Sequence, residues 1–338
     1  MPSASCVLIL GARGRFGLAA TRAFAQAGWK VYAQVRPGAS GPAIAGVQWL
    51  QAQPGDTAAL AAAANGADVV VQGLSPLYTH KAWAADMPGL TQAAIDISRK
   101  LGATLLLPAS VYNFGAAMPP VLHEDTPQRP TTFKGRMRVA SEQQIREATQ
   151  DGRMKAVVIR GGDFFGSGTG SWLDLVMAKQ LRQGKFTYPG ALDVPTTWAY
   201  LPDMARSFVK VAEQRHRLPA FETLHFGGYQ LTGQDWVDAV APIAREQGWV
   251  KSDAALRVTS VSWTLMRALG LFIPTVAALC EMRYLWRTPY ALANARLVAL
   301  IGEEPRTPFP QALRKALDEL GMLAPNSAAA GWVSLSPR

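Results

Sequence analysis

The chain contains 338 residues, of which 49% are hydrophobic and 17% are charged. A chain of this length and composition can bury a sizeable core, which excludes a disordered protein. The formal net charge is +10, yet Lys and Arg never form a run longer than a pair, so we expect a small anionic ligand and no nucleic acid as the partner. The two cysteines, Cys6 and Cys280, are too few for a disulfide framework, and we expect buried thiols in a cytoplasmic protein.

No segment is expected to span a membrane or to act as a secretion signal. The first apolar run leads directly into a glycine-rich turn, which is unlike a signal peptide. The most lipid-like stretch runs from Leu265 to Leu279, but it is too short to cross a bilayer and contains Arg267 and Pro274. We expect this stretch to form either a buried helix pair or a lid over a substrate.

The most informative segment is the apolar run Val7–Leu10, which leads into three glycines spaced three residues apart. Gly11 can adopt the positive backbone angle needed to leave a strand, Gly14 lets the main chain approach a pyrophosphate, and Gly17 lets the following helix lie close to the sheet. The phosphates would then lie at a helix N-terminus, against free N–H groups. The pattern therefore predicts a turn that binds a dinucleotide.

The next elements complete a β-α-β unit and indicate which dinucleotide is bound. Apolar residues recur at helical spacing over 16–27, and a second strand is predicted over Lys30–Val35. Strands that select NAD(H) usually end in an acidic residue, but this strand is followed by Arg36. Together with Arg13 in the glycine turn, Arg36 can hold a 2′-phosphate, so NADP(H) is favoured over NAD(H); in the alternative, either arginine is a solvated surface charge.

Further strands and helices alternate along the chain. Strands are predicted over 47–50, 67–72, 104–107, 154–160 and 221–226. Helices are predicted over 83–101 and 134–149, and two further helices are predicted to end at residues 65 and 181. The strands are rich in Val, Ile and Leu, which indicates an α/β fold of the Rossmann type with a doubly wound parallel sheet. Asp56 is placed either to meet the adenine amino group or to cap the helix that follows it. Gly73 and Leu74 follow the fourth strand, at the edge where ligands collect.

Beyond the sixth strand the alternation weakens, which suggests two parts. Residues 1–160 are expected to form an NADP-binding domain, to which residues 198–220 return. Residues 161–197 and 221–325 are assigned to a smaller, mainly helical C-terminal lobe that binds the substrate. We expect the small-residue tail at 326–338 to be mobile.

Four motifs occur along the chain in a particular order: Gly11–Gly17, Ser110–Gly115, Arg160–Gly166 and Tyr200–Asp203. In their order and spacing they resemble the extended short-chain dehydrogenase/reductase superfamily, which includes NAD(P)-dependent epimerases and dehydratases. The resemblance covers nearly the whole chain and implies the same Rossmann-type fold. It also implies a homodimer, paired through the two helices that flank the fourth and fifth strands.

The resemblance breaks at the catalytic residues. The superfamily usually has a serine or threonine after the fifth strand, and a tyrosine and a lysine four residues apart on the next helix. Ser110 matches the first position, whereas Lys134 stands at the tyrosine position and Arg138 at the lysine position. This spacing still places both side chains on one helix face, directed at the same ligand. The chain is therefore interpreted as an atypical member in which the usual catalytic Tyr and Lys are replaced.

Several residues remain as candidates for the proton donor. Lys134 lies near another cation, which lowers its pKa towards neutrality, so it is either a proton donor or a structural or phosphate-binding cation. Tyr112, on the same loop as Ser110, and Tyr78, after the fourth strand, can reach the nicotinamide edge of the cleft or can simply pack there.

Two further polar residues follow strands at this edge. Asp163 is either a carboxylate that contacts the substrate or a loop cap, and Asn113 is either a ligand of a substrate carbonyl or part of its own turn. The four histidines are scattered without metal-ligand spacing, so we expect no metal.

These residues lead to one predicted function and two alternatives. We predict an NADP(H)-dependent oxidoreductase that acts on a carbonyl or activated double bond of a small, apolar or ring-bearing substrate. The alternatives are a redox-silent NADP(H)-binding sensor or scaffold, and an epimerase or isomerase that retains its cofactor. The predicted catalytic residues are Ser110, Tyr112, Lys134, Tyr78 and Arg138. The predicted cofactor-binding residues are Gly11, Arg13, Gly14, Arg15, Phe16, Gly17, Arg36, Asp56, Gly73 and Leu74.

Overall fold

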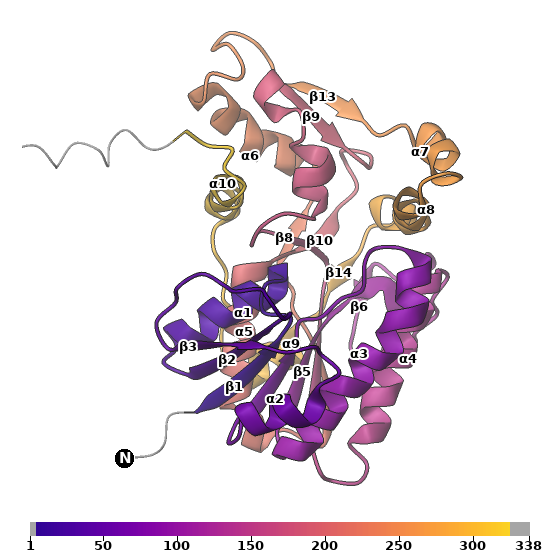
Figure 1. The fold of residues 1–338 in the computed structure, drawn as a ribbon. Coiled ribbons are helices and arrows are strands. Elements are labelled where there is room, and N and C mark those ends of the chain that lie inside the picture. Colours follow the sequence, from indigo (N-terminus) through magenta and orange to yellow (C-terminus); the bar gives the residue numbers. More distant parts are fainter. Residues whose placement is uncertain (1–4, 325–338) are drawn as a thin grey trace, which may run out of the picture.

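A seven-stranded parallel sheet forms the lower half of the molecule in the computed structural model, which describes residues 5–324 (Figure 1). Its strands are β1 (Cys6–Leu10), β2 (Lys30–Val35), β3 (Val47–Gln51), β4 (Val69–Gln72), β5 (Thr104–Ser110), β7 (Lys155–Gly161) and β11 (Phe221–His225). They lie in the order β11-β7-β5-β4-β1-β2-β3, and their pairings are parallel. Strands β2 and β3 lie on one side of β1, and β4 lies on its other side. This reversal of the strand order creates a crevice at the carboxyl ends of β1 and β4. The predicted doubly wound sheet is confirmed.

Helices cover both faces of this sheet, because its strands are apolar on both sides. One layer contains α1 (Arg15–Gln26), α5 (Leu201–Glu213) and α9 (Ala295–Ile301), and the other contains α2 (Thr57–Ala63), α3 (His80–Leu101) and α4 (Phe133–Ala148). In β1, Val7 and Ile9 pack with the first layer, whereas Leu8 and Leu10 pack with the second. The alternation along each strand thus fills two separate cores.

The elements that carry the site begin and end within a few residues of their predicted bounds. Helix α3 begins before the predicted Trp83 because the Thr79 side chain accepts a hydrogen bond from the Ala82 amide at 3.1 Å. Strand β5 extends beyond residue 107 because it pairs with β7 as far as Ser110 and Gly161. Ser110 therefore lies at the carboxyl end of a central strand.

The largest difference from the predicted organisation concerns β11, which was assigned to the smaller lobe with residues 221–325. Helix α5 packs against α1 and carries the chain back to the sheet edge, where β11 pairs in parallel with residues 156–160 of β7. Helix α9 contacts both α5 and β11. The structure corrects the predicted boundary, because β11 and α9 belong with the large sheet.

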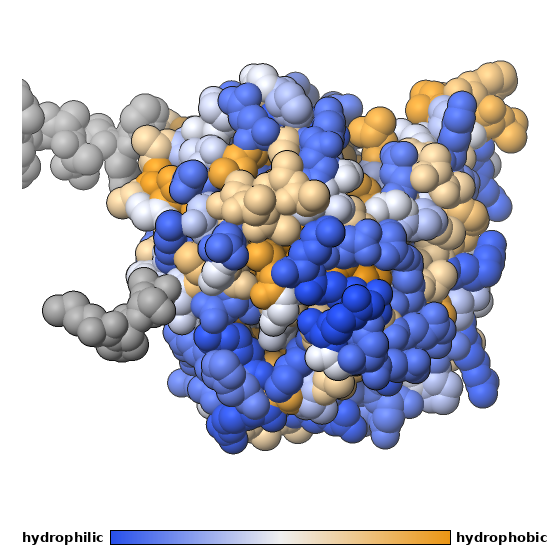
Figure 2. Space-filling view, turned by 60° about the horizontal axis from the view of Figure 1, so that its bottom comes forward, coloured by the Kyte–Doolittle hydropathy of each residue, from blue (hydrophilic) through white to orange (hydrophobic). Residues whose placement is uncertain are grey.

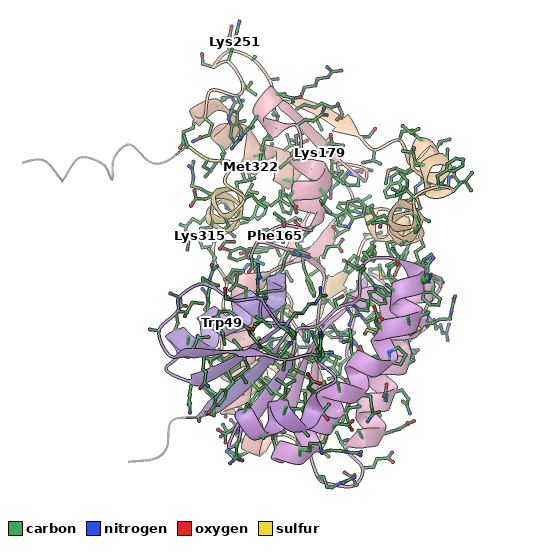
Figure 3. All side chains as sticks on the ribbon, in the orientation of Figure 1. Trp49, Phe165, Lys179, Lys251, Lys315 and Met322 are labelled. Atoms are coloured by element: carbon green, nitrogen blue, oxygen red, sulfur yellow. The ribbon has the colours of Figure 1, made fainter. Side chains whose placement is uncertain are left out.

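The upper part of the molecule in Figure 1 combines short sheets with helices. Strands β8 (Asp163–Phe165), β10 (Thr196–Tyr200) and β12 (Tyr229–Leu231) form one sheet, and β9 (Lys185–Tyr188) pairs with β13 (Arg257–Ser260). The helices are α6 (Gly233–Glu246), α7 (Trp263–Gly270), α8 (Pro274–Cys280) and α10 (Phe309–Glu319). Phe165 lies where the two parts meet in Figure 3, and its ring packs edge-on against Trp198 and Trp236.

The predicted helix that ends at Leu181 is replaced by two short helical turns. The Ala178 amide donates to the Leu173 carbonyl oxygen at 2.7 Å, which gives a wide π-type turn, η2 (Leu173–Met177), and a tighter turn, η3 (Leu181–Gln183), follows. The other short elements are β6 (Val121–Leu122), which pairs with β14 (Ala291–Leu292), and the turns η1 (Val111–Phe114), η4 (Arg215–Arg217) and η5 (Glu281–Trp286).

A membrane-crossing helix, which needs about 20 apolar residues, is absent from residues 5–324. The tail at 326–338, predicted to be mobile, lies outside the described residues.

Candidate active site

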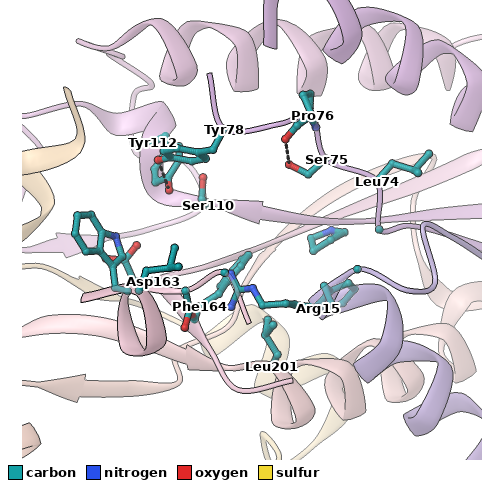
Figure 4. A pocket seen from close by; sticks show the side chains of 18 of the residues that line it. Arg15, Leu74, Ser75, Pro76, Tyr78, Ser110, Tyr112, Asp163, Phe164 and Leu201 are labelled. Carbon is teal, nitrogen blue, oxygen red and sulfur yellow. Dashed lines mark hydrogen bonds between the residues drawn. The ribbon is translucent and has the colours of Figure 1, made fainter. Parts of the chain in front are cut away.

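A cavity of about 430 Å³ lies where the carboxyl edge of the large sheet meets the smaller part of the molecule (Figure 4). The predicted site residues in its lining are Gly14, Arg15, Phe16, Gly73, Leu74, Tyr78, Ser110, Tyr112 and Arg138. The predicted site residues outside its lining are Gly11, Arg13, Gly17, Arg36, Asp56 and Lys134. The cavity therefore joins the predicted phosphate-binding turn to most of the predicted catalytic residues.

The glycine turn has the geometry that its sequence predicts. Gly11 has φ +68°, and a Cβ on Gly17 would overlap the carbonyl oxygen of Gly11, so the turn requires glycine at both positions. Helix α1 follows, and Gly14 at its N-cap provides no side-chain cap. The first amides of α1 thus lie uncapped beside the cavity, where an anion can accept their hydrogen bonds.

Gln34 supports this turn and was not predicted as a site residue. Its side-chain oxygen accepts a hydrogen bond from the Gly11 amide at 2.8 Å, and its Nε2 donates to the Ala52 carbonyl oxygen at 2.7 Å. The Gln34 side chain is buried, so water has little access to its end of either bond. A glutamine inside an otherwise apolar strand is the sequence signal that identifies such a buried polar role.

The residues predicted to recognise the adenosine end lie on exposed loops. Arg13 and Arg36 are both exposed, and they follow β1 and β2, which are adjacent strands. The Asp56 carboxylate accepts a hydrogen bond from the Gln53 amide at 2.9 Å and makes no side-chain cap to α2. Asp56 thus closes the turn before the helix instead of capping the helix itself.

Ser110, Tyr112 and Tyr78 gather on one side of the cavity in Figure 4. The hydroxyls of Tyr78 and Tyr112 lie 3.5 Å apart, and the buried Ser110 Oγ has no hydrogen-bond partner among residues 5–324. Burial, with the nearby Asp163 carboxylate, raises the pKa of Tyr112 to about 12, and burial raises the pKa of Tyr78 well above its usual value. All three groups are therefore protonated hydroxyls at neutral pH, able to donate to a ligand in the cavity.

Arg138 lines the cavity and Lys134 does not, which differs from the prediction that both side chains are directed at one ligand. The Arg138 guanidinium lies 5.1 Å from the centre of the Trp83 ring in the cavity lining. Lys134 is fully buried outside the cavity, where its ammonium donates to the Ala278 carbonyl oxygen at 3.1 Å and to Glu281 at 3.0 Å.

This environment favours the structural alternative for Lys134. Burial lowers its pKa, but the hydrogen bond and the charge of Glu281 oppose that change. The ammonium also lies 4.2 Å from the centre of the Tyr78 ring. Lys134 thus links α4 to the end of α8 next to Tyr78, and it is not among the residues that line the cavity.

Asp163 lies across the cavity from Ser110 in Figure 4. Burial raises the pKa of its carboxyl group to about 7, although the positive charge of Arg15 opposes the change. The Arg15 guanidinium donates to the Phe164 carbonyl oxygen at 3.2 Å. The side chain of Arg15, as well as its backbone, therefore lines the cavity. Of the two interpretations of Asp163, the position favours a carboxylate that contacts a ligand.

A buried polar network lies behind the site and includes residues that were not predicted. Arg160 forms a two-point ion pair with Glu142, at 2.6 Å and 3.3 Å. Gln128 donates to Glu142 and accepts from Asn113, so Asn113 belongs to this network and not to the cavity lining. The proximity of Arg160 adds to burial in lowering the pKa of His225 to about 3. These residues hold α4 against β7 and thereby fix the position of Arg138.

Comparisons with known proteins place this geometry in context. A sequence model of the NAD dependent epimerase/dehydratase family matches residues 7–227. A search of curated protein sequences finds no match.

Several solved structures share the fold. A protein from Burkholderia cenocepacia J2315 described as an epimerase is 21% identical, with a TM-score of 0.69 over 94% of this chain and 98% of that one. WbmH from Bordetella bronchiseptica, solved with NAD+, is 15% identical, with a TM-score of 0.69 over 94% of this chain and 98% of that one. MoeE5, solved with UDP-glucose and NAD, is 15% identical, with a TM-score of 0.68 over 93% of this chain and 98% of that one. At these identities the likeness establishes the fold alone.

Proposed function

Since this chain belongs to the NAD dependent epimerase/dehydratase family, we propose that it is an NADP(H)-dependent oxidoreductase that acts on a carbonyl or activated double bond. The observation that carries this proposal is the cavity itself, which extends from the N-terminus of α1 to the hydroxyl of Ser110. A nicotinamide dinucleotide, when bound, supplies the hydride or accepts it. The chain supplies binding, orientation and proton donors.

The residues around the cavity fit a dinucleotide. The uncapped first turn of α1 is suited to the pyrophosphate, and Arg138 is suited to a ribose or phosphate oxygen because its buried Nε lacks a partner within the described chain. Arg13 and Arg36 extend from the loops after β1 and β2, where a 2′-phosphate would add two negative charges. We therefore assign the phosphorylated cofactor to this chain in preference to NAD(H).

Ser110 and Tyr112 are proposed to polarise the reacting oxygen of the substrate. Both hydroxyls remain protonated at neutral pH, and Tyr78 orients Tyr112 through the 3.5 Å contact between their hydroxyls. Asp163 faces them across the cavity and titrates near neutrality, so it can give or take a proton at the opposite side of the substrate. These groups replace the tyrosine that the superfamily uses.

The remainder of the lining supports an apolar or ring-bearing substrate. Besides the residues discussed above, it includes Trp83, Trp172, Leu175, Val176 and Leu279. Side chains of this kind exclude water and strengthen the hydrogen bonds that Ser110 and Tyr112 make.

A spectrophotometric screen tests the proposal. Purified protein is incubated with NADPH and a panel of apolar ketones, aldehydes and enones, and loss of the reduced cofactor is followed. We expect turnover of at least one compound, with kcat/KM reduced about 100-fold by Ser110→Ala, as for loss of one oxyanion donor. Tyr32→Phe, which removes a hydroxyl group from β2 outside the cavity, should leave the rate unchanged.

The position of Lys134 favours a second candidate, a protein that binds NADP(H) without redox turnover. Its ammonium donates to Glu281 and to the Ala278 carbonyl oxygen, so the residue at the usual tyrosine position is held outside the cavity lining. Binding of NADPH without turnover of any compound in the screen would select this candidate. Incorporation of solvent deuterium into a compound without net oxidation of NADPH would instead select an epimerase or isomerase that retains its cofactor.

A further inference from the structure

Helices α7 and α8 form a hairpin, residues 263–280, that exposes large apolar side chains at its tip. Of the nine large hydrophobic residues exposed within residues 5–324, five lie in this hairpin: Leu265, Leu269, Leu271, Phe272 and Ile273. Phe272 is 84% exposed and Leu271 is 81% exposed. Figure 2 shows apolar side chains gathered on the projection at its upper right, where α7 and α8 lie. The prediction of a buried helix pair over 265–279 is therefore wrong for the outer face of the hairpin.

The hairpin that carries the exposed tip also lines the cavity. Thr275 and Leu279 of α8 belong to the cavity lining, so the inner face of the hairpin is a wall of the site. Two more of the nine exposed residues are found at the same cavity: Leu175 lines it, and Leu77 lies between the lining residues Pro76 and Tyr78. Seven of the nine exposed apolar side chains therefore lie either in the hairpin or at the cavity that the hairpin lines. Scattered apolar residues are normal on a protein surface, but a cluster of this kind marks an interaction site.

The base of the hairpin is fixed, so its tip projects from the molecule. The Trp263 indole donates to the Pro189 carbonyl oxygen at 2.8 Å. At the other end, Lys134 donates to the Ala278 carbonyl oxygen and to Glu281. The two helices cross closely, because a Cβ on Gly270 would lie only 3.1 Å from the Ala277 Cα atom. With both ends held and the helices packed together, the apolar tip keeps its projecting position.

Charges near the hairpin indicate what covers this tip. Residues 262–290 contain three arginines, Arg267, Arg283 and Arg287. Their one acidic residue, Glu281, forms an ion pair with Lys134. The segment therefore carries net positive charge, with the exposed Arg267 in the hairpin itself, and the whole chain has a net charge of +10. An apolar face flanked by arginines is the arrangement that binds an anionic lipid surface.

We propose that the α7–α8 hairpin docks on the surface of an anionic lipid bilayer, with Leu271 and Phe272 inserted among the acyl chains and Arg267 at the headgroups. A second copy of the chain is a poorer occupant, because a stable dimer buries about 800 Å² on each partner and the tip presents only a few side chains. In this orientation the cavity wall formed by Thr275 and Leu279 lies next to the bilayer. Entry of a lipid-soluble substrate past Thr275 and Leu279 would then rest on the proposed function, whereas the docking itself does not.

Vesicle flotation with the full chain, in the absence of any dinucleotide, tests the docking. We expect the protein to float with vesicles of mixed phosphatidylglycerol and phosphatidylcholine and to float much less with phosphatidylcholine alone. The double substitution Leu271→Ser and Phe272→Ser should lower the partition coefficient at least tenfold. Val298→Ser, which alters a 40% exposed residue of α9 outside the hairpin, is the matched control and should leave it unchanged.

Two results would overturn the proposal. The first is failure of the wild-type chain to bind anionic vesicles while it still binds NADPH, which leaves the proposed function intact. The second is a dimer in sedimentation velocity that dissociates in the Leu271→Ser, Phe272→Ser variant without any vesicle binding, which assigns the tip to a second copy. Circular dichroism of each variant should show a retained fold, since Leu271 and Phe272 both lie on the exposed tip.

Discussion

Replacing Lys134 with Met tests whether this residue is an anchor or a proton donor. The substitution removes a fully buried ammonium from Ala278 and Glu281 while nearly preserving the side-chain volume. Removing one partner of a buried ion pair costs about 3–5 kcal/mol when the other charge stays buried and unpaired. The Glu281 side chain is 18% exposed and still accepts a hydrogen bond from the Phe133 amide at 3.1 Å. We therefore expect a smaller loss in the free energy of unfolding, about 2–3 kcal/mol.

Urea unfolding measures this loss directly. With a denaturant slope of about 3 kcal/mol/M for a chain of this size, the midpoint should fall by about 0.7–1 M. A double-mutant cycle with Glu281→Gln isolates the pair, and we expect a coupling free energy of at least about 1 kcal/mol. Lys81→Met, an exposed lysine on α3, is the control and should change stability by less than about 0.5 kcal/mol.

The pH dependence gives a second check on the same pair. Burial by itself would raise the pKa of Glu281, but the hydrogen bond and charge of Lys134 outweigh it and hold the pKa below its ordinary 4.5. A depressed carboxyl pKa contributes stability that is present above the ordinary value and is lost as the pH falls through the depressed value. The gap between wild type and Lys134→Met should therefore shrink below pH 4.5. An unchanged urea midpoint together with a lost reaction rate would refute the anchoring role and restore Lys134 as a proton donor.

Three other substitutions test the structure around the site. Arg160→Met leaves the buried Glu142 carboxylate unpaired and should lower the free energy of unfolding by about 3–5 kcal/mol in urea, whereas a loss below 1 kcal/mol would contradict the buried network. Gly17→Ala should weaken NADPH binding at least tenfold in a fluorescence titration, because its Cβ overlaps the preceding turn, while Gly89→Ala, a helical glycine with open space, should not. Asp163→Asn should gain stability relative to wild type as the pH rises from 4 to 8, because a carboxyl group with a pKa raised to about 7 resists ionisation in the folded state; a pH-independent difference would show that the group is solvated.

The nucleotide-binding half of the fold was predictable because its signals are local. The glycine turn and the strand over Lys30–Val35 each depend on a few adjacent residues, and the structure confirms the strand at its predicted bounds. The position of β11 was not predictable in the same way. Its pairing with β7 depends on how α5 packs against α1, which no short sequence pattern encodes.

The site was predictable where its residues end strands of the parallel sheet. Ser110, Tyr112 and Tyr78 follow neighbouring strands, so the sheet brings them together as the sequence analysis expected. Lys134 differs because its orientation is set by Glu281, which is 147 positions away in the sequence. Gln34 was missed for a similar reason, since its hydrogen-bond partner Gly11 lies in the turn that follows a different strand.

We propose that a phosphorylated nicotinamide dinucleotide binds across the carboxyl edge of the sheet, with its 2′-phosphate at Arg13 and Arg36. Calorimetric titration of the full chain with NADPH and with NADH tests it most directly. One charge-assisted hydrogen bond is worth about 1.5–3 kcal/mol, so NADPH should bind at least about tenfold more tightly than NADH, and Arg36→Ala should remove most of that difference. Absence of binding by either dinucleotide, or tighter binding of NADH, would contradict the account.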